Sequence, residues 1–457
     1  MDLAITGGTL VTEHGVYPAD IGIAGGRVVA IATPGALPPA GETLDATGML
    51  VLPGAIDTHF HCRTPGYDER GDFYTETRAA AAGGVTTLFE MPISNPGCAT
   101  PAIFRNRRRL LEEQAIIDVA LYGAPGTLSR DDVHGMAAEG AIAFKIFMHR
   151  PPLGRDDEFI GICLTEDEQL FQALALVKET GRRLVVHCES DTMLEAGIAR
   201  MRATGRTDFA AHGESRPPAV EAVAIARLLT LAEALDASVH VAHVTCHQAL
   251  AVIRRFRRDG VNVTAETCPH YLLYDEERAA ALGPYARINP PIRSAADQAA
   301  LWSGLADGTL DLVTTDHSTY LPAEKERGWN DIWRAPSGAP GVQCLLPAMM
   351  TAALRGKITL QKAVQLIAGN PARIFGLAGR KGTIAPGADA DLCLYDPAPA
   401  TIFTREMMFS QARDVDKLYE HMEFQGRVIA TIAGGRVIYR EGEILAERGS
   451  GRFLAAG

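Results

Sequence analysis

The chain has 457 residues, of which 47% are hydrophobic, 22% charged and 6% aromatic, so it can form one large domain and a smaller one. The formal net charge of -11 argues against nucleic acid or an anionic membrane as the main partner, because both select basic surfaces. The N-terminus lacks the basic region and long apolar run of a signal peptide, and no segment is apolar for long enough to cross a bilayer, so we expect a cytoplasmic protein with no membrane partner.

The two ends of the chain, residues 1–52 and 381–457, have the same sequence pattern, in which short runs typical of β-strands are separated by glycine. These runs lie at 3–6, 21–31, 49–52, 390–395 and 428–439. Gly-Gly-Arg-Val occurs in both sections, at 25–28 and 434–437, and is typical of a hairpin turn, so a shared turn explains it without a repeat. We predict that both ends pair into one small β-sandwich domain, with 1–52 as its N-terminal part and 381–457 as its C-terminal part and a tail.

Residues 53–380 alternate apolar, β-branched runs with amphipathic helical stretches such as 165–180 and 218–236. The eight runs are 52–56, 85–90, 117–122, 142–147, 183–187, 238–243, 261–266 and 310–316. Most are apolar nearly throughout, as expected of parallel strands that are buried on both faces. Eight such units predict an α/β protein with a (β/α)8 TIM barrel. The competing fold is an open doubly wound sheet, but no G-x-G-x-x-G opens a helix after the first run.

His59 and His61 lie where the first apolar run ends, two residues apart and therefore on one side of a strand. Two imidazoles that converge on one point are typical ligands of a divalent transition metal. Two histidines in an ordinary loop are the alternative interpretation of this pair alone. The eight cysteines contain no C-x-x-C pair, so the sequence predicts neither disulfides nor a thiolate zinc site.

Four further groups lie in or at the ends of the other predicted strands, where the catalytic groups of a barrel gather. Lys145 lies within the fourth run, His187 and His243 end the fifth and sixth, and Asp316 ends the eighth. Each one alone has a simpler explanation, such as a core histidine or a helix cap. Together with the histidine pair, they predict one metal site at the mouth of the barrel.

The chain resembles the amidohydrolase superfamily, and within it the cyclic amidohydrolases: hydantoinases, dihydropyrimidinases, allantoinases and dihydroorotases. The order of the six groups carries the resemblance, together with motifs at 53–57, 82–87, 144–145, 186–189, 269–271, 289–293, 315–317 and 382–392. The resemblance implies two divalent metal ions, zinc by preference. It places one ion on His59, His61, Asp316 and a Lys145 carboxylated by CO2, and the other on that Lys145, His187 and His243.

The resemblance also implies a reaction, namely hydrolysis of a cyclic amide to an N-carbamoyl or ureido acid by a hydroxide that bridges the metals. Two metals about 3.5–4 Å apart can share a water and lower its pKa. Asp316 would take the proton and pass it to the leaving ring nitrogen. Hydantoinases usually have a tyrosine oxyanion donor a few residues after the lysine. This chain has none there, so His149 or the metal must serve.

The amino-acid sequence is compatible with two classes of substrate. Arg63 follows the histidine pair and, with Asn289, resembles the carboxylate site of dihydroorotases, but Ile93 and Tyr320 replace an asparagine and a histidine expected there. The segments 90–93, 324–333 and 336–341 instead resemble allantoinases and L-hydantoinases. We therefore predict a small five-membered cyclic ureide, hydantoin-like or allantoin, whose ring amide is read by backbone groups of Asn289 and Ser337. Dihydroorotate is the alternative substrate.

Catalytic competence and oligomeric state are predicted from the family resemblance alone. Some relatives in this branch are non-catalytic scaffolds that have lost metal ligands, whereas this chain keeps all six groups. Homo-oligomers are common in the branch, so we expect a dimer or tetramer.

Overall fold

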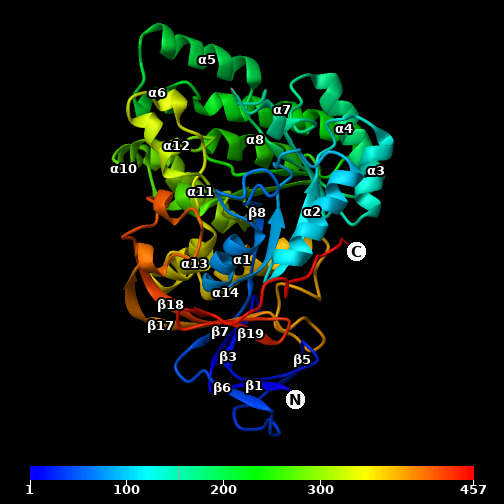
Figure 1. Ribbon diagram of the computed structural model, residues 1–457, viewed down its shortest axis with the longest axis vertical. Coiled ribbons are helices and arrows are strands. Elements are labelled where there is room, and N and C mark those ends of the chain that lie inside the picture. Colours follow the sequence, from blue (N-terminus) through cyan, green and yellow to red (C-terminus); the bar gives the residue numbers. More distant parts are fainter. Residues whose placement is uncertain (153, 457) are drawn as a thin grey trace.

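A closed parallel barrel forms the larger part of the molecule (Figure 1). The computed structural model describes residues 1–152 and 154–456, and its largest sheet has the strand order β15-β14-β13-β12-β11-β10-β9-β8-β16. Strand β15 (Leu312–Val313) pairs with β14, and β16 (His317–Ser318), which follows it directly in the chain, pairs with β8 (Ala55–His61). The sheet therefore closes on itself, and the predicted TIM barrel is confirmed.

The other barrel strands lie within one or two residues of the predicted runs. They are β9 (Val85–Glu90), β10 (Asp118–Gly123), β11 (Ala143–Phe147), β12 (Leu184–His187), β13 (Val239–Val241) and β14 (Val263–Thr267). All residues of β9 to β13 are buried, as parallel strands covered by helices require.

The first and last predicted runs need correction. The run 52–56 divides at Gly54 between β7 (Leu50–Pro53) of a second sheet and β8 of the barrel. A side chain on Gly54 would meet Thr86 Oγ1 at 2.2 Å, so the chain needs glycine where it passes from one sheet to the other. The run 310–316 is not one strand, because residues 314–316 separate β15 from β16.

Helices surround the barrel strands (Figure 1). They are α1 (Phe73–Ala82), α2 (Pro101–Gln114), α3 (Arg130–Ala138), α4 (Asp167–Glu179), α5 (Asp191–Ala203), α6 (Phe209–Glu214), α7 (Pro218–Leu235), α8 (His247–Arg258), α9 (Pro269–Leu273), α10 (Glu276–Ala280), α11 (Ala295–Asp307), α12 (Pro322–Glu326), α13 (Leu345–Leu354), α14 (Leu360–Val364) and α15 (Asn370–Ile374). The predicted helices at 165–180 and 218–236 are α4 and α7. Among the described residues, no helix is both long and apolar enough to span a bilayer. The eight cysteines are free, and all are buried except the half-buried Cys163.

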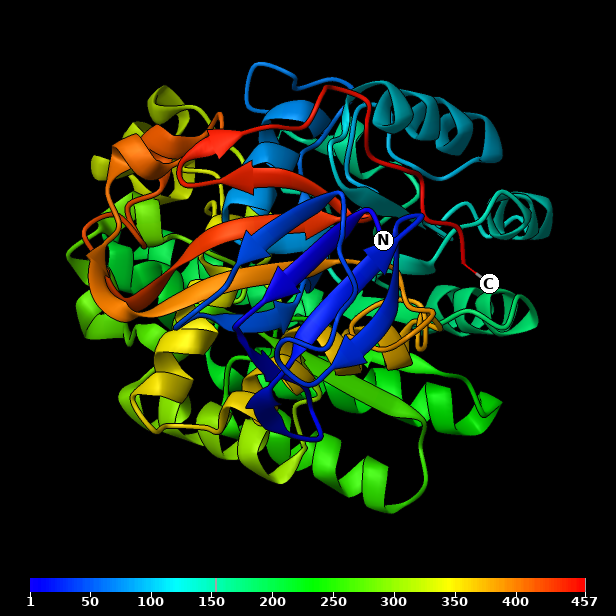
Figure 2. The ribbon, with the colours of Figure 1, turned by 90° about the horizontal axis from the view of Figure 1, so that it is seen from below.

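Two smaller sheets lie below the barrel and contain strands from both end sections of the chain (Figures 1 and 2). The C-terminal tail after them returns to the barrel, where Phe453 pairs with Val119. The first sheet holds β5 (Arg27–Ala32), β4 (Asp20–Ala24), β1 (Leu3–Thr6) and β6 (Glu42–Asp45). The second holds β20 (Glu443–Ile444), β19 (Arg436–Arg440), β18 (Glu423–Ala433), β17 (Leu392–Ile402), β7, β2 (Thr9–Val11) and β3 (Val16–Pro18). Side chains of both sheets share one apolar core, which includes Ile5, Ile21, Val51 and Leu392.

The pairing of the two chain ends is direct, because β7 from the N-terminal section pairs with β17 from the C-terminal one. The two Gly-Gly-Arg-Val copies are hairpin turns that pack on each other. A side chain on Gly435 would approach Gly26 Cα to 2.9 Å. The shared motif thus has a packing reason. The domain bounds at 1–52, 53–380 and 381–457 stay a prediction; β7 ends at Pro53, close to the first of them.

A buried ion cluster joins the barrel to the small sheets. Lys381 Nζ lies 2.6 Å from Asp118, 2.5 Å from Asp391 and 3.1 Å from Asp389, and all four side chains are buried. Removing the ammonium would leave three buried carboxylates with Arg452 as their main remaining partner. We expect Lys381→Met to lower the free energy of unfolding by about 3–5 kcal/mol, measured by urea denaturation.

Arg380→Met is the matched control, because Arg380 binds the same Asp389 but its side chain is 44% exposed. This change should cost at most about 1 kcal/mol. Equal losses in the two variants would contradict the structural role given to Lys381.

Candidate metal centre

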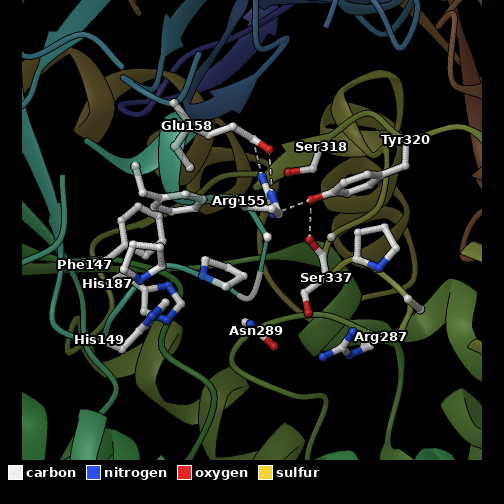
Figure 3. Close-up of a pocket in the computed structure, with 18 of the residues that line it drawn as sticks. Phe147, His149, Arg155, Glu158, His187, Arg287, Asn289, Ser318, Tyr320 and Ser337 are labelled. Carbon is white, nitrogen blue, oxygen red and sulfur yellow. Dashed lines mark hydrogen bonds and ion pairs between the residues drawn. The ribbon is translucent and has the colours of Figure 1, made fainter. Parts of the chain in front are cut away.

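A pocket of about 560 Å³ opens at the carboxyl ends of the barrel strands (Figure 3). Nine of the ten side chains singled out in the sequence line it: His59, His61, Arg63, His149, His187, His243, Asn289, Asp316 and Ser337. Lys145 is the exception, because its side chain is fully buried within the barrel, 5.2 Å above the Phe147 ring. Residues that are far apart in the sequence therefore meet at one mouth, as the barrel predicts.

The first group of candidate ligands is His59, His61 and Asp316. Their ligand atoms lie within 4.8 Å of one another. Nε2 of His59 lies 3.2 Å, and Nε2 of His61 lies 3.3 Å, from the same oxygen of Asp316. All three face one point at the end of β8.

The second group is His187 and His243, which extend toward the first group. Nε2 of His187 donates to Glu189 at 2.8 Å, which leaves Nδ1 as the lone-pair nitrogen. That Nδ1 lies 3.0 Å from Nε2 of His243. The rings of His59 and His243 are 5.1 Å apart, so the two groups form one continuous site.

The chain turns sharply at two of these residues. The predicted runs reached His243 and Asp316 as strands, but β13 ends at Val241 and β15 at Val313. His243 and Asp316 have φ values of 36° and 49°, in the left-handed region that residues with a side chain rarely adopt. Such backbone conformations cluster at functional sites, where the surroundings hold them.

Asp57 holds the turn before Asp316. Its buried carboxylate accepts hydrogen bonds from the hydroxyls of Thr314 and Thr315 and, at 3.1 Å, from the backbone N–H of Thr315. It also accepts one from the backbone N–H of His59 at 3.2 Å. Asp57 thus fixes the first and last strands of the barrel to each other beside the site.

Burial sets the charge state of the site. It lowers the pKa of His59 to about 4 and that of His187 to about 3, so both rings are neutral near pH 7. Burial also lowers the pKa of the Lys145 amine and raises that of the Asp316 carboxyl. Neutral imidazoles and a lysine amine pushed toward its free-base form are the species that metal binding and carboxylation require.

Two carboxylates that were not singled out in the sequence orient the histidines. Glu266 lies 2.5 Å from His59 Nδ1 and 3.0 Å from His240 Nε2, and the two rings hold its pKa well below the usual range. Glu189 binds His187, and Arg216 Nη1 donates to it at 2.7 Å. Glu266 ends the predicted run 261–266, so its place at a strand end was a signal available in the sequence.

His149 lies beside the second group, with its ring 4.8 Å from that of His187. Its Nδ1 lies 2.6 Å from the carbonyl oxygen of Arg150, which can only accept, so Nδ1 carries the hydrogen. Burial lowers the pKa of the ring, and in the neutral form Nε2 is then an acceptor. In this tautomer, Nε2 of His149 cannot donate a hydrogen bond to an oxyanion, which is the role suggested for His149 from the sequence. The metal is the other group expected to stabilise the oxyanion.

Asn289 and Ser337 lie on the wall opposite the histidines (Figure 3). The buried Oδ1 of Asn289 has no hydrogen-bond partner among the described residues, whereas the carbonyl of Ser337 accepts from the Tyr320 hydroxyl at 2.7 Å. A carbonyl oxygen has a second lone pair, so Ser337 can still accept from a ring N–H. Tyr320 therefore holds part of this wall in place.

The candidate ligands include buried nitrogen atoms that lack hydrogen-bond partners, as expected of a metal centre. Within the part of the chain that the structure describes, four of the six candidate ligands have a buried nitrogen without a hydrogen-bond partner: His59 Nε2, His61 Nδ1, Lys145 Nζ and His243 Nδ1. Of the three histidines, His59 turns this unpaired nitrogen toward Asp316, whereas His61 and His243 turn their Nε2 atoms toward neighbouring ligands. Buried polar groups are normally paired, so a cluster of unpaired ones needs an explanation. A donor set of neutral imidazoles, a carboxylate and a lysine able to take up CO2 suits divalent metals such as zinc.

The chain is similar to known proteins over nearly its whole length. The amidohydrolase family matches residues 50–438. An L-hydantoinase from Paenarthrobacter aurescens is 33% identical over 99% of this chain and 98% of its own, and an allantoinase from Streptomyces avermitilis is 37% identical over 98% of both. A solved structure of an L-hydantoinase (dihydropyrimidinase) from Arthrobacter aurescens superposes with a TM-score of 0.94 at 32% identity, over 99% of each chain. The chain therefore belongs to the amidohydrolase family.

Proposed function

We propose that this protein is a metal-dependent hydrolase that opens the amide bond of a cyclic ureide to give an N-carbamoyl or ureido acid. The observation that carries the proposal is the convergence of five metal-competent side chains on one pocket at the end of the barrel, namely His59, His61, His187, His243 and Asp316. The sixth group, Lys145, is buried within the barrel, and its amine has no hydrogen-bond partner among the described residues. The chain is also similar over nearly its whole length to proteins named L-hydantoinase, D-hydantoinase and allantoinase.

Two divalent ions, zinc by preference, would be held by these groups. His59, His61 and Asp316 would hold one ion and His187 and His243 the other, with a carboxylated Lys145 shared by both. Bound there, the ions would supply an activated water and polarise the ring carbonyl.

Asp316 is the group placed to move the proton. It lies at the pocket wall beside both histidines of the first group, where its carboxylate can exchange a proton with a bound ring. It would accept a proton on its carboxylate and return it to the leaving ring nitrogen. Asn289 and Ser337 would orient the ring through their backbone groups from the opposite wall.

A substrate panel tests the proposal. The purified protein, supplied with zinc and bicarbonate, is assayed for ring opening of allantoin, substituted hydantoins, dihydrouracil and dihydroorotate. We expect turnover of a five-membered ureide. Turnover of dihydroorotate but not of hydantoins or allantoin would favour the alternative function, dihydroorotase. If none of the four compounds is turned over, the protein is better explained as a non-catalytic relative of these enzymes. Light scattering of the same sample tests the dimer or tetramer, which stays a prediction.

Glu266 supplies a prediction for metal binding. Its carboxylate fixes the orientation of His59 through Nδ1, and such outer partners of a ligand support metal affinity. We expect Glu266→Gln to weaken metal binding about 10–100-fold, measured by competition with a chromogenic chelator.

Glu221→Gln is the matched control, because Glu221 is equally buried but binds Thr245 and touches none of the six candidate ligands. Its metal affinity should stay at the level of the unmodified protein. An undiminished affinity in the Glu266 variant would show that His59 needs no such support.

A further inference from the structure

Arg63 lies at the edge of the candidate metal centre. It follows His61 by two residues, has a φ of 63°, and is 3% exposed, and it lines the same pocket as His61 and Asp316. A guanidinium in this position is well suited to bind a carboxylate on a substrate ring. What already occupies the guanidinium therefore decides whether such a substrate can bind.

The carboxylate that occupies it belongs to the protein. Glu158, in the short 3-10 helix η1 (Asp156–Phe159), accepts from Arg63 Nη1 at 3.0 Å and is 2% exposed. Arg155 grips the same carboxylate with Nε at 2.8 Å and Nη2 at 2.5 Å. These charges hold the pKa of Glu158 at about 2, so the carboxylate is ionised.

The remaining terminal nitrogen of Arg63 is also engaged. Nη2 donates to the Tyr320 hydroxyl at 2.7 Å, and that hydroxyl donates in turn to the Ser337 carbonyl. Arg63 Cζ lies 4.9 Å from the centre of the Tyr320 ring. Figure 3 shows Glu158, Arg155 and Tyr320 on one side of the pocket, with His149 and His187 on the other. Both terminal nitrogens of the guanidinium, which would form the paired contact with a substrate carboxylate, thus already have partners in the protein, and only the buried Nε has none among the described residues.

We propose that Glu158 is a specificity-determining residue, because its carboxylate fills the site on Arg63 that a carboxylate on the substrate ring would need. This inference rests on the proposed function and narrows its substrate to uncharged cyclic ureide rings. A ring carboxylate would have to displace a buried, doubly paired carboxylate, or lie beside it as a like charge, and both are unfavourable. Neutral rings meet no such obstacle.

The test compares two ligands that differ in the carboxylate, dihydroorotate and dihydrouracil. Glu158→Ala opens space beside Arg63, and Glu158→Gln removes the charge at nearly the same size. With the metal-loaded protein, calorimetry measures the affinity of each ligand. We expect Glu158→Ala to bind dihydroorotate at least about tenfold more tightly than the unmodified protein does, with dihydrouracil unchanged. Glu158→Gln should show a smaller gain in the same direction.

Glu195→Ala is the control for net charge, because Glu195 also lines the pocket but is exposed and forms no contact with Arg63. An equal gain in this variant would overturn the proposal, since the effect would then be one of overall charge. So would tight binding of dihydroorotate to the unmodified protein, or no gain in either Glu158 variant. If Glu158 only anchored its loop, its removal would lower stability and turnover without creating affinity for an anion.

Failure of this inference can be told apart from failure of the proposed function. Absence of any ring-opening activity would reject the function, while the calorimetric comparison would still decide whether Glu158 excludes anions. Hydrolysis of hydantoins or allantoin with no change on replacing Glu158 would keep the function and reject the inference. If Glu158→Ala does not fold, the comparison rests on Glu158→Gln.

Discussion

Replacing Lys145 by alanine is expected to remove the bound metal and the hydrolytic activity together. Lys145 Nζ is fully buried and has no hydrogen-bond partner among the described residues, and burial lowers the pKa of the amine. Such an amine could take up CO2 and would then supply an anionic ligand for the metal ions, whereas alanine provides no replacement ligand. The activity should fall at least about 10³-fold, with metal content measured by elemental analysis of the same sample.

Lys325→Met is the control for the loss of a buried lysine. Lys325 is as fully buried as Lys145, but its Nζ binds three backbone carbonyls, among them that of Pro336 at 3.0 Å. This variant should keep its metal. The carbamate itself can be observed by ¹³C NMR after exchange with labelled bicarbonate. Full activity with two ions in Lys145→Ala would contradict the bridging role.

Replacing Asp316 by asparagine is expected to lower kcat about 10²–10⁴-fold while most of the metal stays bound. The amide keeps the size of the side chain but cannot take up the proton, and the other candidate ligands remain. Asparagine is also the suitable replacement for the backbone, because φ at this position is 49° and asparagine tolerates the left-handed region better than alanine.

The measurement is kcat beside metal content, so that chemistry and binding are separated. Lys145→Ala should lose both quantities, whereas Asp316→Asn should lose mainly kcat. An unchanged kcat in Asp316→Asn would remove Asp316 as the proton carrier. A fall in kcat that merely follows the loss of metal would reduce its role to that of a ligand.

The barrel could be predicted from the sequence because its strands are buried on both faces and therefore read as uninterrupted apolar runs. Lys145 lies within β11 and His187 ends β12, as expected. The turns at His243 and Asp316 could not be predicted in the same way. Their left-handed φ values are accompanied by contacts from other strands: Asp57 of the first strand accepts from Thr315 next to Asp316, and Glu266 accepts from the backbone N–H of His243 at 3.4 Å.

The residues that support the site were harder to find, because their partners are distant in the chain. Glu266 meets His59, and Glu158 meets Arg63, across more than 90 residues of sequence. The sequence posed Arg63 as a possible carboxylate site, and only the contact with Glu158 shows that the protein supplies the carboxylate itself. Tyr320 replaces a histidine expected in dihydroorotases. The structure shows that its hydroxyl connects Arg63 to the Ser337 carbonyl through two hydrogen bonds.

The most direct test of the account is a metal titration of the purified protein. After removal of metal with a chelator, zinc is added back in the presence of bicarbonate, and bound zinc and ring-opening activity are measured on the same samples. We expect about two ions per chain at saturation, with activity absent from the metal-free protein and restored as the site fills. Activity that persists in the metal-free protein, or a protein that binds no ion at saturation, would contradict the two-metal centre.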